Sequence, residues 1–281
     1  MKSLLMATDL SARSDRALER ALVLARQHRA ALQVVCVVDE ALPDTMAIHH
    51  KEAAEETLRR HLAALPADAA PSVATDVKIG KPIAGILGQA RDTKAELIVL
   101  GTHDVAHESA FRGTTCERII RMGDLPVLVV KDRASEPYRR VVVAVDFSVH
   151  ARRAIEFVLG LAPDAEIHLV HAYQVPFAGF MYGTDTRLQV KKEERQQMER
   201  MIEEEMAASL HALGADAGKL HQVLSHGEVR QVIAQEVERL KPDLLALGTH
   251  GRTGVAHAFL GSIAEDVLGH PPCDALAVKA W

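Results

Sequence analysis

The residues with the clearest chemical meaning lie near the C-terminus, where an apolar run over residues 244–247 ends in a glycine-rich segment. Gly248 and Gly251 come first, and the pair Gly261 and Ser262 opens a stretch with helical spacing. Glycine tolerates a positive φ and lets a ligand approach the backbone, because it has no side chain. The first turn of a helix presents N–H groups and a partial positive charge to an anion. This segment therefore predicts two backbone sites for a phosphate.

The spacing of these glycines differs from the commonest phosphate-binding motifs. It is not the G-x-G-x-x-G of a dinucleotide fold, and no lysine follows the last glycine as it does in a P-loop. The observed spacing, G-x2-G-x9-G-S after an apolar strand, resembles the nucleotide loop of the universal stress protein family. The resemblance implies that ATP, with or without Mg²⁺, binds here. The residues implied to form the loop side of this site are Leu247, Gly248, His250, Gly251, Arg252, Gly261, Ser262, Ile263 and Ala264.

The glycine-rich segment belongs to the second copy of an internal repeat. Residues 4–11 and 142–148 are both apolar runs that end in Asp-x-Ser, and residues 95–103 return as 242–250, each ending in Gly-Thr-His. Between them, short apolar runs alternate with stretches of helical spacing, among them residues 50–64 and 188–213. Each half therefore reads β-α-β-α-β-α-β-α-β, which predicts a parallel, doubly wound sheet with right-handed crossovers.

Both halves, over nearly the whole chain, are similar to universal stress protein domains. The resemblance implies two tandem Rossmann-like domains of the adenine nucleotide alpha hydrolase type, each with five parallel strands in the order 3-2-1-4-5 and helices on both faces. We expect domains over residues 1–133 and 139–281, joined by a polar linker around residues 132–138. The resemblance also implies that the halves pair through their fifth strands as an internal pseudo-dimer, while a homodimer of two chains is left open.

The same resemblance implies where the nucleoside binds. The residues implied to flank the adenine and ribose are Ala144, Val145, Asp146 and Ala172. Independently, ligands of open α/β sheets bind beyond the carboxyl ends of the strands, at a topological switch point. Asp146 and Gly248 end the first and fourth strands of the second half, which are expected to be neighbours.

The first half departs from the loop pattern. Gly101 is followed at the second glycine position by Asp104, and only eight residues separate Asp104 from Gly113. A carboxylate there would repel a polyphosphate, so we expect a degenerate second site that excludes ATP but could still accept adenosine. The residues of this degenerate site are Asp9, Val37, Gly101, Gly113 and Thr114.

Several of these residues also have simpler roles. Asp146 either contacts the ribose or caps the following turn, as Asp-x-Ser commonly does. Ser262 is expected to cap a helix beside the anion site. Arg252 either binds a phosphate as a fork donor or is a solvated surface charge. His250 is expected to act chiefly through its backbone.

A metal site is not predicted. His103 and His107 superficially match a zinc-binding helix motif, but they follow a strand in an expected loop, where the two rings would not share a face. The three cysteines are widely spaced, and Cys36 lies inside an apolar strand, where it is expected to be core.

Composition limits the class of protein further. Hydrophobic residues make up 48% and charged residues 25% of the chain, with a net charge of −5, which does not favour nucleic-acid binding. The apolar stretches are too short to span a membrane, and the one near Met1 is too short for a signal peptide, so neither feature is expected. Three isolated cysteines suit a reducing compartment, so a cytoplasmic location is expected.

The second half also carries an insertion over residues 176–183, which contains Phe177, Phe180 and Tyr182 beside two glycines. Two interpretations stay open: the segment packs on the partner domain, or it forms a lid or docking surface.

The leading hypothesis is an ATP-binding stress-response or signalling protein, with nucleotide in the second half and a conformational output to an unidentified protein partner. One alternative is an enzyme that slowly hydrolyses ATP or transfers an adenylyl group. Against it, we find no evident general base and no carboxylate pair for Mg²⁺ near the loop, so no catalytic residue is assigned. The other alternative is a nucleotide-independent scaffold or carrier of a hydrophobic ligand.

Overall fold

A computed structural model of the chain describes residues 1–64, 72–102, 114–174, 184–213, 220–251 and 260–280, without the side chains of residues 184–192. The described residues of the first half form β1 (Ser3–Thr8), α1 (Ala12–His28), β2 (Ala31–Asp39), α2 (Asp44–Ala63), β3 (Ser72–Gly80), α3 (Pro82–Asp92), β4 (Leu97–Gly101), α4 (Thr115–Met122) and β5 (Val127–Val130). Those of the second half form β6 (Arg140–Ala144), α5 (Val149–Leu161), β7 (Glu166–Tyr173), α6 (Thr184–Ala212), β8 (Leu220–His226), α7 (Val229–Leu240), β9 (Leu244–Gly248), α8 (Ser262–Gly269) and β10 (Asp274–Val278).

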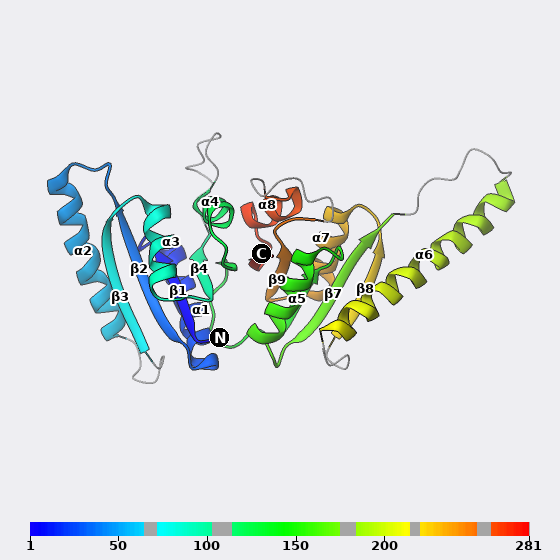
Figure 1. Cartoon of the computed structure of the whole chain (residues 1–281), viewed down its shortest axis with the longest axis horizontal. Coiled ribbons are helices and arrows are strands. Elements are labelled where there is room, and N and C mark those ends of the chain that lie inside the picture. The colour runs from blue at the N-terminus through cyan, green and yellow to red at the C-terminus, as the bar shows by residue number, and fades with distance from the viewer. Residues whose placement is uncertain (65–71, 103–113, 175–183, 214–219, 252–259, 281) are drawn as a thin grey trace.

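The strands lie in one continuous sheet in the order β3-β2-β1-β4-β5-β10-β9-β6-β7-β8. Each half has the predicted order 3-2-1-4-5, and its internal strand pairs are parallel. The fold class expected from the repeat is therefore confirmed. Figure 1 shows the two halves side by side, with α4 and α8 close together at their junction. The division at residues 133 and 139 stays a prediction, and a homodimer stays open.

The two halves join through their fifth strands, as the resemblance implied. β5 and β10 pair antiparallel, with Leu128 opposite Leu276. A strand at the end of a sheet presents unpaired backbone groups that attract other chains. Because β5 and β10 cover one another, this pairing removes one such edge from each half.

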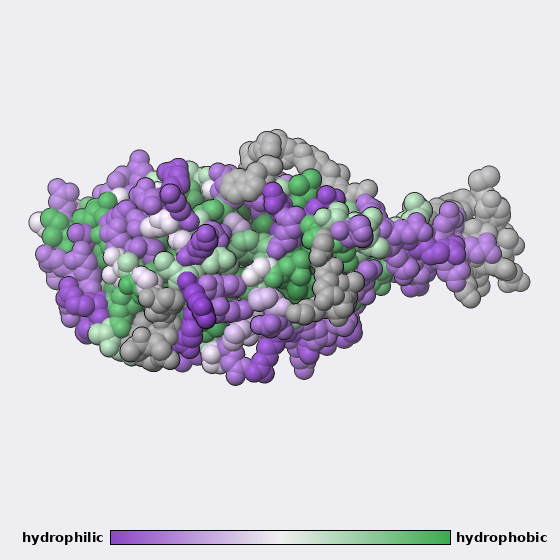
Figure 2. All heavy atoms as spheres, turned by 60° about the horizontal axis from the view of Figure 1, so that its bottom comes forward, coloured by the Kyte–Doolittle hydropathy of each residue, from purple (hydrophilic) through white to green (hydrophobic). Residues whose placement is uncertain are grey.

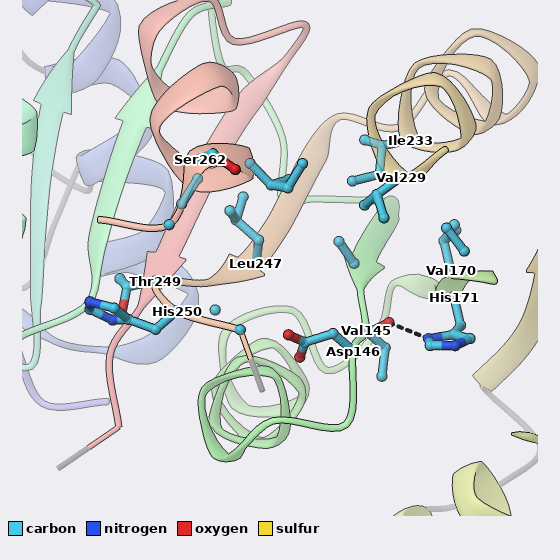
Figure 3. A pocket seen from close by; sticks show the side chains of 17 residues that line it. Val145, Asp146, Val170, His171, Val229, Ile233, Leu247, Thr249, His250 and Ser262 are labelled. Carbon is cyan, nitrogen blue, oxygen red and sulfur yellow. Dashed lines mark hydrogen bonds between the residues drawn. The ribbon is translucent and has the colours of Figure 1, made fainter. Parts of the chain in front are cut away.

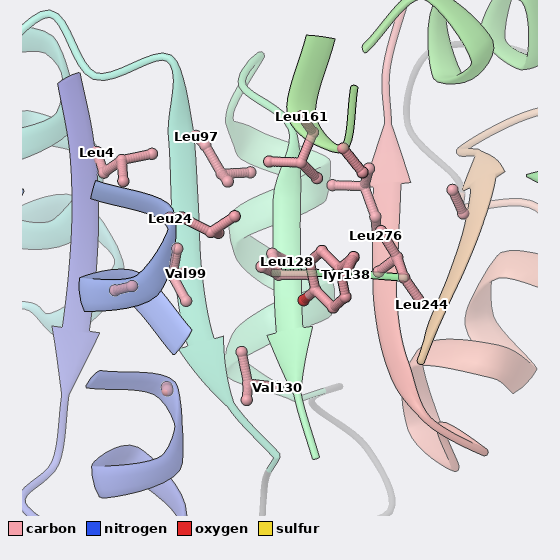
Figure 4. Close-up of a cluster of buried hydrophobic side chains, with 14 of the residues drawn as sticks. Leu4, Leu24, Leu97, Val99, Leu128, Val130, Tyr138, Leu161, Leu244 and Leu276 are labelled. Atoms are coloured by element: carbon pink, nitrogen blue, oxygen red, sulfur yellow. The ribbon is translucent and has the colours of Figure 1, made fainter. Parts of the chain in front are cut away.

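Two buried clusters fill the two faces of the sheet. Successive strand residues point to opposite faces, so Leu4 and Met6 join one cluster while Leu5 and Ala7 join the other. Helices α1, α2, α5 and α6 contribute to the first cluster, and α3, α4, α7 and α8 to the second. Figure 4 shows the first cluster running across the junction of the halves. The sheet is thus covered on both sides, as expected of a doubly wound fold.

Helix α2 begins earlier than the apolar spacing predicted, at Asp44 rather than near residue 50. Pro43 precedes it in an extended conformation, and the Asp44 carboxylate lies in the first turn, where it complements the helix dipole. The first turns bury little apolar surface, with Met46 and Ile48 about half exposed. Hydrophobic periodicity therefore gave no signal for this part of the helix.

The outer surface mixes hydrophilic and hydrophobic residues on the face that Figure 2 shows. Scattered exposed apolar residues of this kind are usual for a folded domain. No helix in the described part of the chain is both long enough and apolar enough to cross a membrane.

A buried ionic network ties the connection between the halves to the sheet. The Asp274 carboxylate, at the start of β10, pairs with Nε of Arg20 on α1 at 3.1 Å and accepts a hydrogen bond of 2.7 Å from the Tyr138 hydroxyl. Its other oxygen accepts from the backbone N–H groups of Lys131 and Asp132 at 2.9 and 3.2 Å. Figure 4 shows Tyr138 beside Leu128 and Leu276. The predicted linker is therefore polar only in part, because its last residue, Tyr138, is core.

Removing one partner from this network should destabilise the fold strongly. Burial raises the pKa of Asp274 even though Arg20 opposes the shift, so desolvation is a large cost of the pair. Asp274→Ala leaves the Arg20 guanidinium buried and unpaired, which we expect to cost about 3–5 kcal/mol of unfolding free energy in urea melts. The exposed pair of Arg153 and Glu156 provides the control, and Glu156→Ala should cost less than about 1 kcal/mol. Equal losses in the two variants would contradict a central role for the network.

Candidate functional site

A cavity of about 310 Å³ opens at the carboxyl ends of β6, β7 and β9. Strands β6 and β9 are neighbours whose crossover helices leave in opposite directions, which is the switch point where open α/β sheets bind ligands. Its walls come from the ends of these strands, from α7 and from the first turn of α8 (Figure 3). The lining residues are Ala144, Val145, Asp146, Val170, His171, Ala172, Val229, Ile233, Leu247, Gly248, Thr249, His250, Gly251, Gly261, Ser262, Ile263 and Ala264.

The structure brings together nearly all the residues predicted for the main site. Every one of them lines this cavity except Arg252, which lies outside the described residues. The residues that sequence reasoning missed are Val170, His171, Val229, Ile233 and Thr249. Val229 and Ile233 lie one helical turn apart on α7, so their spacing gave a signal for a shared face but none for what that face meets.

Gly248 lines the cavity and also has a packing role that the sequence did not predict. A Cβ added there would lie 2.6 Å from Cβ of His150 and 2.8 Å from the backbone nitrogen of Ala151, both in α5. A Cβ added at Gly101 would likewise lie 2.8 Å from the backbone of Arg13 in α1. Neither Gly248 nor Gly251 has a positive φ. Gly248 and Gly101 therefore let a helix pack against a strand, which explains why the first half keeps this glycine although its loop differs.

Gly251 is the glycine that shapes the cavity. A Cβ at this position would lie 3.0 Å from Oδ2 of Asp146. The other carboxylate oxygen of Asp146, Oδ1, accepts a hydrogen bond of 3.0 Å from the backbone N–H of Ser148. Asp146 therefore caps the turn, one of the two roles that the sequence left open, and it also lines the cavity. Its contact with a ribose stays a prediction.

The turn that positions Asp146 is unusual. Phe147, the next residue, has a φ of 61°, a left-handed conformation that is costly for an aromatic residue. Its ring packs on His171 with centroids 4.7 Å apart, and Nδ1 of His171 donates a hydrogen bond of 2.7 Å to the Val145 carbonyl. The His171 ring thus supports the wall on which Asp146 lies.

The first turn of α8 forms the opposite side of the cavity. Gly261 is the N-cap, and Ser262 is the first helical residue, so the expectation that Ser262 caps the helix is wrong. Without a hydroxyl at the N-cap position, α8 has no side-chain cap hydrogen bond, although Nη2 of Arg230 donates to the Ser262 carbonyl at 3.3 Å. The N–H of Gly261 donates to the Thr249 carbonyl at 2.9 Å, which anchors the helix start to the end of β9. The helix dipole makes this end favourable for an anion.

Both the ring and the backbone carbonyl of His250 make contacts within the protein, so its role toward a ligand stays a prediction. Its Nδ1 lies 3.0 Å from the Thr249 hydroxyl, and Figure 3 shows the ring turned toward Thr249 and away from Asp146. Its carbonyl accepts a hydrogen bond of 3.3 Å from the Ser148 hydroxyl. These contacts connect the end of β9 to the start of α5.

The corresponding residues of the first half are occupied by internal contacts. Oδ1 of Asp9 accepts hydrogen bonds from the Ser14 hydroxyl at 2.6 Å and the Ser11 N–H at 2.9 Å. Burial tends to raise the pKa of Asp9, but the bonds from Ser11 and Ser14 outweigh it and the pKa is lowered. Val37 packs against α3, where a Cβ at Gly85 would meet it at 3.0 Å.

Thr114 caps α4, whose Glu117 carboxylate returns to the Thr114 backbone. Of the remaining first-half positions, Gly101 ends β4, while Asp104 and Gly113 lie outside the described residues.

The described residues were also compared with the requirements of a metal site and of a reactive thiol. There, no group of three or more His, Cys, Asp or Glu side chains is arranged to hold a metal ion, while His103 and His107 are not described. Cys36 is core as expected, and burial raises the pKa of Cys116 and Cys273 to about 12. The insertion over residues 176–183 also lies outside the described residues.

Two tandem doubly wound units, with a cavity at the switch point of the second, define a tandem Rossmann-like protein. The chain belongs to the universal stress protein family, whose sequence profile matches residues 1–131 and 137–279. It resembles, over its whole length, the crystal structure of a universal stress protein from Archaeoglobus fulgidus, with a TM-score of 0.68, 22% identity and coverage of 99% of this chain and 98% of that one. At this identity the likeness concerns the fold alone.

Curated relatives match parts of the chain. A universal stress protein of Methanocaldococcus jannaschii is 29% identical over 147 residues, which are 50% of this chain and 82% of that protein. Universal stress protein E of Escherichia coli is 26% identical over 204 residues, which are 65% of this chain and 62% of that protein. The match thus spans less than two thirds of universal stress protein E.

The packing role of Gly248 predicts a loss of stability on substitution. Gly248→Ala puts a methyl group against the backbone of α5, and we expect it to destabilise the fold by about 1–3 kcal/mol in urea melts. Gly160, which lies in α5, is the control, because a Cβ there meets no atom within 4 Å. Gly160→Ala should leave stability unchanged or raise it slightly. If Gly248→Ala matched wild type, close packing at this glycine would be refuted.

Proposed function

We propose that the second half binds ATP in the cavity between β6, β9, α7 and α8, and that the protein is a cytoplasmic stress-response protein that signals its nucleotide state. The phosphates would lie at Gly261 and the first turn of α8, and the ribose at Asp146. The base would lie against Ala172, Val229 and Ile233.

The observation that carries this proposal is the division of the cavity into two chemically different sides. One side is apolar, formed by Val170, Val229 and Ile233. The other offers the Asp146 carboxylate and the N-terminus of α8, which no described side chain caps. A base suits the first side, whereas a ribose hydroxyl and a phosphate suit the second. A volume of about 310 Å³ is within the usual range for small-molecule sites.

Three differences between the halves support nucleotide binding in the second half. The Ser14 hydroxyl donates a hydrogen bond to the Asp9 carboxylate. In the second half the residue equivalent to Ser14 is Ala151, whose side chain has no donor for Asp146. Thr114 caps α4, whereas Gly261 leaves α8 without a side-chain cap.

The third difference is the loop residue. Asp104 replaces the glycine that gives Asp146 its room in the second half. Each change removes a group that a nucleotide would need or adds one that would repel it.

The output would be a conformational signal. Bound nucleotide would contact β6, β9, α7 and α8 at once, so it would favour one arrangement of these elements over others. A protein partner that recognises that arrangement would read the nucleotide state. The three buried, unpaired cysteines suit the reducing cytoplasm in which such a partner would be met.

Calorimetry with ATP, with and without Mg²⁺, tests the proposal directly. Wild type should bind one ATP per chain, and Gly251→Asp should abolish binding, because the new carboxylate lies against Asp146 and repels the phosphates. Gly160→Asp adds the same charge away from the cavity and should bind as wild type does. Circular dichroism confirms that each variant is folded. Absence of ATP binding to wild type would refute the proposal, and two sites per chain would refute a degenerate first half.

A second test compares the two aspartates at equivalent positions. Asp146→Ala should weaken ATP binding by about 10- to 100-fold, the loss expected for a hydrogen bond to a charged group. Asp9→Ala, its matched control in the first half, should leave ATP affinity unchanged. The same titrations with adenosine should show the Asp146 effect, because the ribose is common to both ligands. Equal effects of the two substitutions would contradict a site confined to the second half.

A further inference from the structure

Helices α4 and α8 occupy equivalent positions in the repeat and begin with the same capping signature. The first half has Thr114 followed by Glu117, and the second has Ser262 followed by Glu265. A hydroxyl residue with a glutamate three positions later is the usual pattern of a capping box, in which the two residues satisfy each other's backbone N–H groups.

In α4 this pattern forms the expected contacts. The Thr114 hydroxyl accepts a hydrogen bond from the Glu117 N–H at 3.2 Å, and Glu117 Oε2 accepts one from the Thr114 N–H at 3.2 Å. Glu117 is only 8% exposed, so its carboxylate is buried at the helix start. The N-terminus of α4 is thus covered by an anion of its own chain.

In α8 the same pattern does not form a capping box. Gly261 is the N-cap, and no described side chain accepts from the first turn. Glu265 instead points across the junction of the halves, where its Oε1 accepts a hydrogen bond of 3.4 Å from Nη2 of Arg121 in α4. The two helices are in contact at the junction of the halves (Figure 1).

The first half lacks the reciprocal contact. The repeat places Gly269, at the end of α8, where α4 has Arg121. Glu117 therefore has no arginine from α8 to draw it away from its own helix. The pair of Arg121 and Glu265 is an asymmetric feature of a nearly symmetric junction.

We infer that Arg121 is a positioning residue for the nucleotide phosphates, an inference that rests on the proposed function. Its ion pair holds Glu265 off the N–H groups of α8 and neutralises its charge, so these groups stay available to a phosphate. Without Arg121, Glu265 turns back and caps α8 as Glu117 caps α4. A phosphate must then displace a carboxylate from the same N–H groups. The degenerate half thus keeps the binding half competent.

Calorimetry with ATP and with adenosine on the full chain tests this role. Arg121→Ala should weaken ATP binding about three- to tenfold, the modest change expected from an exposed ion pair and a helix cap. Adenosine affinity should stay as in wild type, because adenosine has no phosphate. Arg121→Lys should retain most of the ATP affinity, since it keeps the charge near Glu265.

The double variant separates positioning from direct contact. Glu265→Ala removes the competing carboxylate, so Arg121→Ala combined with Glu265→Ala should regain the ATP affinity of Glu265→Ala alone. Arg118→Ala, an exposed arginine on the same helix, is the matched control for net charge and should bind as wild type does.

Three results would overturn the inference while leaving the proposed function intact: unchanged ATP affinity in Arg121→Ala, an equal loss for ATP and adenosine, or a double variant as weak as Arg121→Ala. The last would mean that Arg121 acts on the phosphates itself. Failure of wild type to bind either ligand would instead refute the proposed function, and with it the inference.

Discussion

The antiparallel pairing of β5 with β10 is the constraint on which the rest of the molecule depends. Each half on its own would end in a short apolar strand with unpaired backbone groups, and the pairing satisfies both at once. The Asp274 carboxylate locks this arrangement, because it joins the start of β10 to α1 through Arg20 and to the connecting segment through Tyr138. A buried carboxylate with several donors tolerates little displacement, so the relative orientation of the halves is closely defined.

That orientation has consequences at the site. The pairing brings α4 and α8 together, and only through that contact does Arg121 reach Glu265. Two copies of one fold thereby come to differ in the electrostatics of equivalent helix starts. One start is neutralised by its own glutamate, whereas the other faces the cavity. Single residues produce the other differences between the halves. Ser14 donates to Asp9 where the second half has Ala151, and Gly261 is the N-cap of α8 where Thr114 caps α4.

Much of the fold could be predicted because the repeat and the apolar runs are local signals. Runs such as residues 244–247 must be buried on both faces, and their alternation with helical spacing leaves few topologies. Gly248 and Asp146 could be placed for the same reason, since Gly248 ends a recognisable strand and Asp146 closely follows one. The other loop glycines were placed by the resemblance to the family. Val229 and Ile233 were missed because they reach the cavity from a helix on the other side of it. The packing role of Gly248 was not predicted, because it depends on the position of α5, which no local sequence pattern records.

The capping signatures show most clearly which features the sequence determines and which depend on the tertiary structure. The sequence by itself determined the doubly wound fold, because hydrophobic periodicity and the repeat are local signals, whereas the strand order followed from the resemblance to the family. The sequence presented the same hydroxyl-to-glutamate pattern at residues 114–117 and 262–265. Only the tertiary structure decided that Glu117 caps its helix while Glu265 pairs with Arg121, since that choice depends on a charge brought from the other half by the pairing of β5 and β10.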